Sequence, residues 1–160
     1  KRERINWFLN LGVNPVRLRL REHAADELAH YSKGCVDIEY LFPFGWSEIE
    51  GIARRTNYDL TKHAECSGKQ LIWRDQVSNE TYVPWVVEPA MGTDRAFLTF
   101  LCDAYREEDV DGNPRTVLGL HPRLAPYKVA VFPLVKKDGQ PEKAEQIYNM
   151  LREHYYASYD

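Results

Sequence analysis

The fold of this protein is decided by one stretch, residues 82–101, which reads YVPWVVEPAMGTDRAFLTFL. Its apolar opening predicts a buried strand, a turn follows at Gly92, and an amphipathic helix comes next. This order brings a carboxylate, Glu88, and a cation, Arg95, close to the same turn. A small substrate with an ammonium group beside a polyphosphate needs those charges at one point. The stretch therefore predicts a nucleotide-dependent enzyme.

The helix after this turn is expected over residues 94–107. Asp94 lies favourably near the positive end of the helix, whereas Arg95 is placed against the dipole preference. A cation at that position often faces an anion that the helix terminus also attracts, and Gly92 permits close approach of the backbone. The broad apolar face of the helix comprises Phe97, Leu98, Phe100, Leu101, Ala104 and Tyr105.

Upstream, alternating apolar and polar residues predict strands joined by short polar links, which is typical of an antiparallel sheet. The expected strands are residues 16–21, 35–42, 46–55, 70–73 and 82–88. Helical segments are expected at residues 3–11, at 25–31 and from residue 59 onward.

Two observations concern carboxylates. If residues 46–55 form a regular strand, Glu48, Glu50 and Ile52 share one face, because side chains repeat every two residues. Like charges so close repel mildly unless an ammonium group, a magnesium ion or an arginine lies between them; a solvent-exposed strand face is an equally good interpretation. Glu88 ends an apolar run and is expected to be at least partly buried, so it needs a partner, either a substrate or a structural ion pair.

Beyond the helix, residues 107–114 are expected to form an acidic loop, residues 126–134 a continuous strand and residues 142–156 an amphipathic helix. A strand followed by a helix opens an α/β unit. We therefore expect one domain over residues 1–122 and the incomplete start of a second over residues 123–160.

The composition is that of a folded domain. The chain has 160 residues, 44% hydrophobic and 28% charged, with a net charge of -3, so it has no global attraction to nucleic acid. The three cysteines indicate no disulfide framework and favour a reducing cytoplasm. No apolar run approaches the length of a membrane span. The missing initial Met and the two ends suggest a segment of a longer protein.

Metal and phosphate ligands occur only in small groups along the sequence. His23 and His30 are seven residues apart and His63 and Cys66 three apart, but two ligands do not make a zinc site, so no zinc is expected. The basic residues Arg17, Arg19 and Arg21 alternate and could meet phosphates. A strand face neutralised by nearby acids is the slightly favoured interpretation.

Several long motifs follow one another along the chain: LAHYS at residues 28–32, DIE at 37–39, GWSEIEGIARRTNYDLTKH at 45–63, EPAMGTDR at 88–95 and LAPYKVAV at 124–131. In this order they resemble dimeric-type glycyl-tRNA synthetase. The resemblance covers essentially the whole chain. It implies an α+β fold, the antiparallel sheet of a class II catalytic domain flanked by helices, followed by the first strand and helix of an α/β anticodon-binding domain.

The resemblance also implies roles for individual residues. Glu88 matches the carboxylate that holds the glycine ammonium, in a pocket formed by Glu88, Pro89, Ala90, Met91 and Gly92. The ATP site comprises Glu48, Ile49, Gly92, Thr93, Asp94 and Arg95. Arg95 and Glu48 are the catalytic candidates, Arg95 on the terminal phosphates of ATP and Glu48 as a magnesium ligand. For Glu50 the resemblance implies only a carboxylate that lines or supports the pocket.

The implied activity is ATP-dependent formation of glycyl-adenylate and transfer of glycine to tRNA(Gly), in a homodimer and without a membrane partner. Ala90 stands where many relatives have a serine that helps to bind the glycine amine. The dimerisation motif and the arginine for the α-phosphate would precede Lys1, so the chain alone is expected to be inactive. A non-catalytic synthetase-like module that binds RNA or regulates, and a purely structural domain, remain alternatives.

Overall fold

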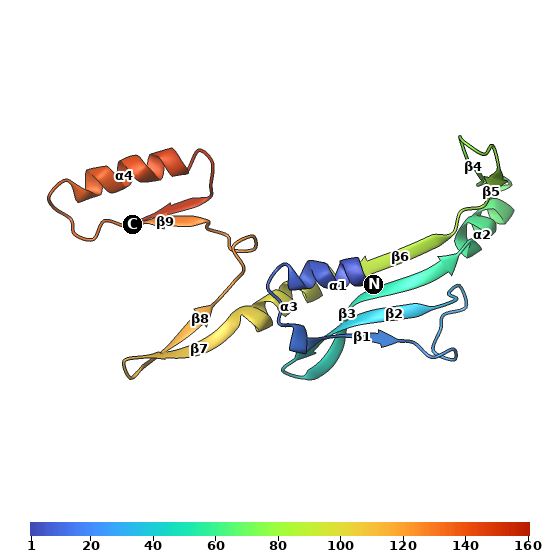
Figure 1. Cartoon of the computed structure of the whole chain (residues 1–160), viewed down its shortest axis with the longest axis horizontal. Helices are drawn as coiled ribbons and strands as arrows, with labels where there is room; N and C mark the ends of the chain where they lie inside the picture. The colour runs from blue at the N-terminus through green and yellow to red at the C-terminus, as the bar shows by residue number, and fades with distance from the viewer. The chain divides into compact units, whose positions relative to one another are not determined.

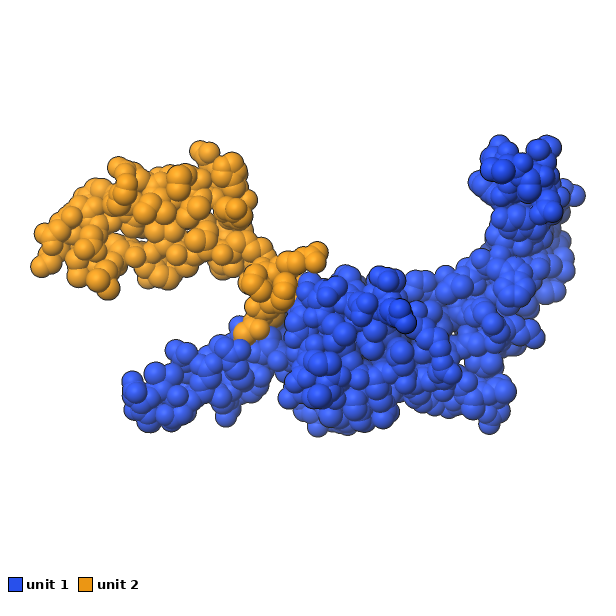
Figure 2. All heavy atoms as spheres, in the orientation of Figure 1, with its two compact units in different colours: residues 1–118 blue, residues 119–160 orange.

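The computed structural model describes residues 1–160, which form two compact units, residues 1–118 and residues 119–160 (Figure 2). The first unit is built on one antiparallel sheet with the strand order β1-β2-β3-β6 (Figure 1). These strands are β1 (Leu18–Glu22), β2 (Cys35–Phe42), β3 (Gly45–Thr56) and β6 (Val86–Met91). The antiparallel sheet predicted from alternation is thus confirmed.

Helices α1 (Arg2–Leu9) and α3 (Thr93–Ala104) pack on one face of this sheet. Trp7 of α1 contacts Phe100 of α3 edge-on, with ring centroids 5.8 Å apart. Gly12 ends the α1 region with a φ of 91°, a conformation that glycine adopts without strain. The buried core beneath the helices comprises Phe8, Val13, Leu18, Ile38, Tyr40, Phe42 and Ile49.

A β-bulge interrupts the pairing of β2 with β3 at Ile49. Ile38 pairs with Glu50 and Glu39 pairs with Glu48, so Ile49 is an extra residue in β3. The extra residue shifts the alternation by one position. The prediction that Glu48 and Glu50 share a face is therefore wrong, since they lie on opposite faces of the sheet.

The predicted strands over residues 70–73 and 82–88 are only partly right. The structure has a short hairpin of β4 (Trp73–Arg74) with β5 (Thr81–Tyr82), and β6 begins after it, at Val86. β6 is an edge strand that pairs only with β3, and Val87 is 61% exposed. The expectation of a buried strand is therefore wrong. The apolar residues belong to a strand that has only one neighbour in the sheet, and they are not enclosed on all sides.

Helix α3 ends at Ala104, earlier than predicted, and its outer residues Phe97 and Leu98 are exposed. The acidic segment that follows is a hairpin of β7 (Tyr105–Val110) and β8 (Asn113–Leu118), and not a loop. Its turn consists of Asp111 and Gly112, which both have positive φ. An Asp-Gly pair is a strong hairpin signal that the sequence interpretation overlooked.

The remaining predictions for the first unit concern its helices. Helix α2 (Tyr58–Ser67) is present, as is a 3-10 helix, η1 (Pro15–Arg17), ahead of β1. Residues 25–31 form turns and no helix. None of the helices combines the length and apolar character needed to cross a bilayer.

The second unit is a small βαβ arrangement of β9 (Val129–Val131), α4 (Gln140–Leu151) and β10 (Ala157–Tyr159). β9 and β10 pair in parallel, and α4 lies alongside them (Figure 1). The predicted α/β unit is confirmed. The predicted continuous strand over residues 126–134 shortens to β9, and the predicted helix ends at Leu151, where turns lead into β10.

Candidate active site on the polar face of the sheet

The face of the first sheet opposite α1 and α3 carries part of the predicted site, including Glu48 and Glu88. Ile38 and Tyr40 point into the core, so Asp37 and Glu39, which alternate with them along β2, point to the other side. Register then assigns residues of β3 and β6 to the same side. We call this face the polar face; it comprises Asp37, Glu39, Glu48, Gly51, Ala53, Glu88 and Ala90.

Small residues form the middle of the polar face. Gly51 pairs with Ala90, and Ala53 pairs with Glu88. A Cβ atom at Gly51 would lie 3.3 Å from Oε1 of Glu48 and 3.7 Å from Oδ1 of Asp37. The absence of a side chain there therefore keeps space beside the carboxylates.

Glu88 is more exposed than predicted and has a cationic partner. Its side chain is 46% exposed, and Oε2 accepts a 2.6 Å hydrogen bond from Nη1 of Arg55. The same guanidinium donates to both carboxylate oxygens of Asp59, at 2.6 and 2.9 Å, and lies 3.9 Å from the ring centroid of Tyr31. The hydrogen bonds from Arg55 hold the pKa of Asp59 below its usual value. Oε1 of Glu88 accepts no hydrogen bond and remains available.

Arg95 lies in the first turn of α3, as predicted, and approaches the bulge in β3. Its Nη1 donates to the backbone oxygen of Glu48 at 2.7 Å, while the Glu48 carboxylate forms no hydrogen bond or ion pair. Gly92 is the N-cap residue with an unexceptional φ of -74°. A Cβ atom there would lie 3.7 Å from the Arg95 side chain, an ordinary contact, so the backbone itself does not require glycine.

Two predicted site residues lie elsewhere. Ile49 is 1% exposed, and its side chain packs in the core. Glu50 is fully buried and binds Arg4 of α1 through two hydrogen bonds of 2.6 and 2.9 Å. The bulge explains both positions, because it turns these two side chains toward the helices.

Strand register places the other predicted site residues of β6 on different faces of the sheet. Met91 pairs with Glu50 and Pro89 with Ile52, so both side chains lie on the helix-covered side, where Met91 packs against the core. Thr93 and Asp94 are exposed at the start of α3. Only Glu48, Glu88 and Ala90 of the predicted side chains are thus placed on the polar face by register.

The arginines of β1 are neutralised. Arg19 binds Glu39 at 2.5 Å, and Arg21 lies 3.7 Å from Asp37 and also binds Glu27. Arg17 belongs to η1 and donates to the hydroxyl of Tyr40. These contacts agree with the interpretation of a strand face balanced by acids, and no continuous basic surface results.

One cluster was missed by the sequence analysis. His23, Cys35 and Asp37 lie together where β1 and β2 pair, although neither His23 nor Cys35 has a spacing that suggests it. Burial, together with the negative charge of Asp37, raises the pKa of the Cys35 thiol. A hollow of about 420 Å³ borders His23 and Cys35, but Glu48, Glu88 and Arg95 do not line it.

No protein-family model matches the chain. Among curated proteins, a glycine–tRNA ligase of Geobacillus thermodenitrificans is 52% identical over 155 residues, covering 96% of this chain and 33% of the relative. One from Clostridium tetani is 53% identical over 156 residues, 97% and 33% of the two chains. One from Borrelia hermsii is 48% identical over 164 residues, 100% and 37%. The chain thus spans about a third of the length of these relatives.

Among solved structures, a Giardia lamblia prolyl-tRNA synthetase in complex with prolyl-adenylate matches with a TM-score of 0.58. The match covers 90% of this chain and 28% of that one, at 14% identity. This likeness shows the fold: the chain has the α+β architecture of a class II synthetase. The relatives and the fold together confirm the resemblance to glycyl-tRNA synthetases.

Proposed function

We propose that the protein carrying this chain activates glycine with ATP and transfers it to tRNA(Gly). The proposal rests on homology to glycine–tRNA ligases, of whose length the chain covers about a third. The observation that carries the proposal is identity of about 50% across 96–100% of the chain. The three free cysteines agree with a cytoplasmic location. Residues 123–160 would start the anticodon-binding domain of a homodimeric enzyme.

Glycine would bind on the polar face beside Glu88. Its ammonium group would meet the free Oε1 of Glu88, while Arg55 continues to hold Oε2. Gly51 and Ala90, which pair next to that carboxylate, leave room for a substrate without a side chain. Larger amino acids would be excluded by contact with the strands, which discriminates better than a lost methylene, worth about 1–3 kcal/mol.

ATP would bind toward the start of α3. Arg95 has free N–H groups beyond the single hydrogen bond to the Glu48 backbone and would contact the terminal phosphates. The unpaired Glu48 carboxylate would hold the magnesium ion that accompanies ATP as substrate, since magnesium prefers oxygen ligands. Gly92, Thr93 and Asp94 would border this site.

Activation requires little proton transfer. A glycine carboxylate oxygen attacks the α-phosphorus of ATP in line, the new P–O bond forms, and the bond to pyrophosphate breaks. Arg95 would stabilise charge on the departing phosphates, and Glu88 would orient the attacking substrate. Positioning and electrostatics therefore supply most of the catalysis.

Glycine-dependent exchange of pyrophosphate into ATP tests the proposal. The measurement compares this chain with a protein extended at both ends, and we expect exchange in the extended protein only. No exchange in a well-folded extended protein would overturn the proposal. Retained tRNA binding in that case would identify a non-catalytic RNA-binding module, and loss of both would leave Glu88 and Arg55 as a structural ion pair.

A further inference from the structure

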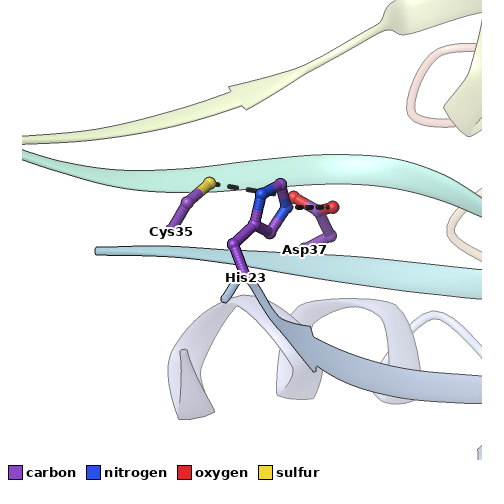
Figure 3. Close-up of side chains that lie close together, drawn as sticks. All are labelled: His23, Cys35 and Asp37. Carbon is purple, nitrogen blue, oxygen red and sulfur yellow. Dashed lines mark hydrogen bonds and ion pairs between the residues drawn. The ribbon is translucent and has the colours of Figure 1, made fainter. Parts of the chain in front are cut away.

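His23, Cys35 and Asp37 place three different metal-ligating atoms within 4.8 Å of one another. Nε2 of His23 lies 2.6 Å from Oδ2 of Asp37, and Sγ of Cys35 lies 3.9 Å from Oδ1 of Asp37. Figure 3 shows the three side chains turned toward each other beside β2. His23 and Cys35 are partly buried and Asp37 is only 5% exposed, so the cluster is not a chance meeting of flexible surface groups.

Strand pairing creates this cluster. Arg21 pairs with Asp37, and the backbone N–H of His23 donates to the carbonyl oxygen of Cys35 at 3.1 Å, which extends the pairing beyond the last residue of β1. Cys35 and Asp37 are two residues apart in β2 and so share a face. The backbones of both strands, and not a mobile loop, therefore position the ligands.

The donor set decides which ion fits. Magnesium and calcium take oxygen ligands, whereas a thiolate and an imidazole together suit zinc and related late transition metals. We propose that His23, Cys35 and Asp37 bind one zinc ion, with a fourth position open to water.

The distances need only small adjustment. In a tetrahedral zinc site, bond lengths near 2.1 Å to N and O and 2.3 Å to S separate N from O by about 3.4 Å and S from O by about 3.6 Å. In the structure Nε2 of His23 lies 2.6 Å from Oδ2 of Asp37, Sγ of Cys35 lies 3.9 Å from Oδ1, and the three ligand atoms lie within 4.8 Å of one another. The ion would replace the hydrogen bond between His23 and Asp37 and draw Cys35 slightly closer.

One neighbour opposes the ion. Nη1 of Arg21 lies 3.7 Å from Oδ2 of Asp37, but the same guanidinium also binds Glu27, which offers it another partner. Zinc binding is expected to move Arg21 toward Glu27. Removing this positive charge should strengthen binding.

Zinc at this position would link the two ends of the segment that connects β1 to β2, residues 24–34. That connection carries Tyr31, whose ring lies under Arg55, the partner of Glu88. The ion would hold the two ends of this segment together and so stabilise its conformation. The zinc proposal does not rest on the ligase activity proposed above, and its test does not use that activity.

Cobalt(II) titration of the chelator-treated, full-length protein tests the site, because a thiolate ligand produces a charge-transfer band and tetrahedral geometry produces strong visible bands. We expect one cobalt ion per chain, displaced by zinc. Cys35→Ser should abolish the charge-transfer band and weaken binding by at least about 100-fold, the upper end of the loss for an outer partner of a metal ligand. Cys66→Ser, which alters an exposed cysteine, is the matched control and should change nothing.

Circular dichroism establishes that each variant is folded. If Cys35→Ser does not fold, His23→Gln decides the question, since it should weaken cobalt binding to a similar extent. Arg21→Gln should bind cobalt several-fold more tightly. A titration without a charge-transfer band, or a band that survives Cys35→Ser and disappears in Cys66→Ser, would overturn the proposal.

Discussion

Nη1 of Arg55 lies 2.6 Å from Oε2 of Glu88 and joins β3 to the edge strand β6 across the polar face. The same guanidinium is held by Asp59 of α2 and packs against Tyr31. Glu88 is therefore held by Arg55, and one of its oxygens already has a cationic partner. A substrate ammonium would take the other oxygen.

Arg55→Gln should raise the KM for glycine about tenfold, because a hydrogen bond to a charged group contributes about 1.5–3 kcal/mol and 1.4 kcal/mol is tenfold. The KM for ATP should stay the same. Pyrophosphate exchange by the full-length protein measures both constants. Arg54→Gln is the control, since Arg54 is exposed and donates only to a backbone oxygen. Equal increases in the KM for glycine and the KM for ATP would indicate that Arg55 only supports the fold.

Glu88→Gln keeps the shape of the side chain and removes its charge. We expect glycine binding to weaken at least about tenfold, the loss of one charge-assisted interaction, with ATP binding unchanged. Calorimetric titration with each ligand separately measures the two affinities. A parallel decrease in both affinities would identify Glu88 as a structural partner of Arg55.

Arg95→Ala should reduce glycine-dependent pyrophosphate exchange at least about 100-fold, as expected for the loss of a transition-state donor. Arg95→Lys keeps the charge without the planar fork and should recover only part of the activity. Because Arg95 is exposed and binds a single backbone oxygen, neither variant should lower stability much. Unchanged exchange in Arg95→Ala would remove Arg95 from the mechanism.

Arg4→Met should destabilise the first unit, because it leaves the fully buried Glu50 without its partner. Breaking a buried ion pair costs about 3–5 kcal/mol; Arg4 is 34% exposed, so solvent already screens part of this pair and we expect the lower end. Urea unfolding measures the change. The double variant Arg4→Met/Glu50→Leu should recover most of the lost stability, and a double variant as unstable as the single one would contradict this account.

Burial raises the pKa of Tyr40 to about 12. The folded state thus holds this proton more tightly than the unfolded state does, so the stability contribution is complete below pH 10 and is lost as the pH rises from about 10 to about 12. Of the ten tyrosines, one should ionise with a midpoint near pH 12 in an ultraviolet titration, and this late step should be absent in Tyr40→Phe. The stability difference between the two proteins should narrow over the same range; a constant difference would mean that Tyr40 does not titrate so late.

Local sequence predicted the strands of the first sheet well where alternation was strict. β2 matches its predicted range, and β1 and β3 differ by a few residues. Prediction failed where one residue altered the geometry. Ile49 is an ordinary apolar residue in an alternating run, and only its pairing with β2 shows that it is a bulge, which moves Glu50 into the core.

The sequence by itself determined the antiparallel sheet, the helix that begins after Gly92 with Arg95 in its first turn, and the relationship to glycine–tRNA ligases. These features are local, because periodicity, turn residues and motif order are written along the chain. Tertiary structure alone decided that Glu48 and Glu50 lie on opposite faces of the sheet. It also decided that Arg55 contacts Glu88 and that His23 lies close to Cys35 and Asp37. Each of these depends on register between strands, which is set by the packing of the whole sheet against its helices and cannot be read from one segment.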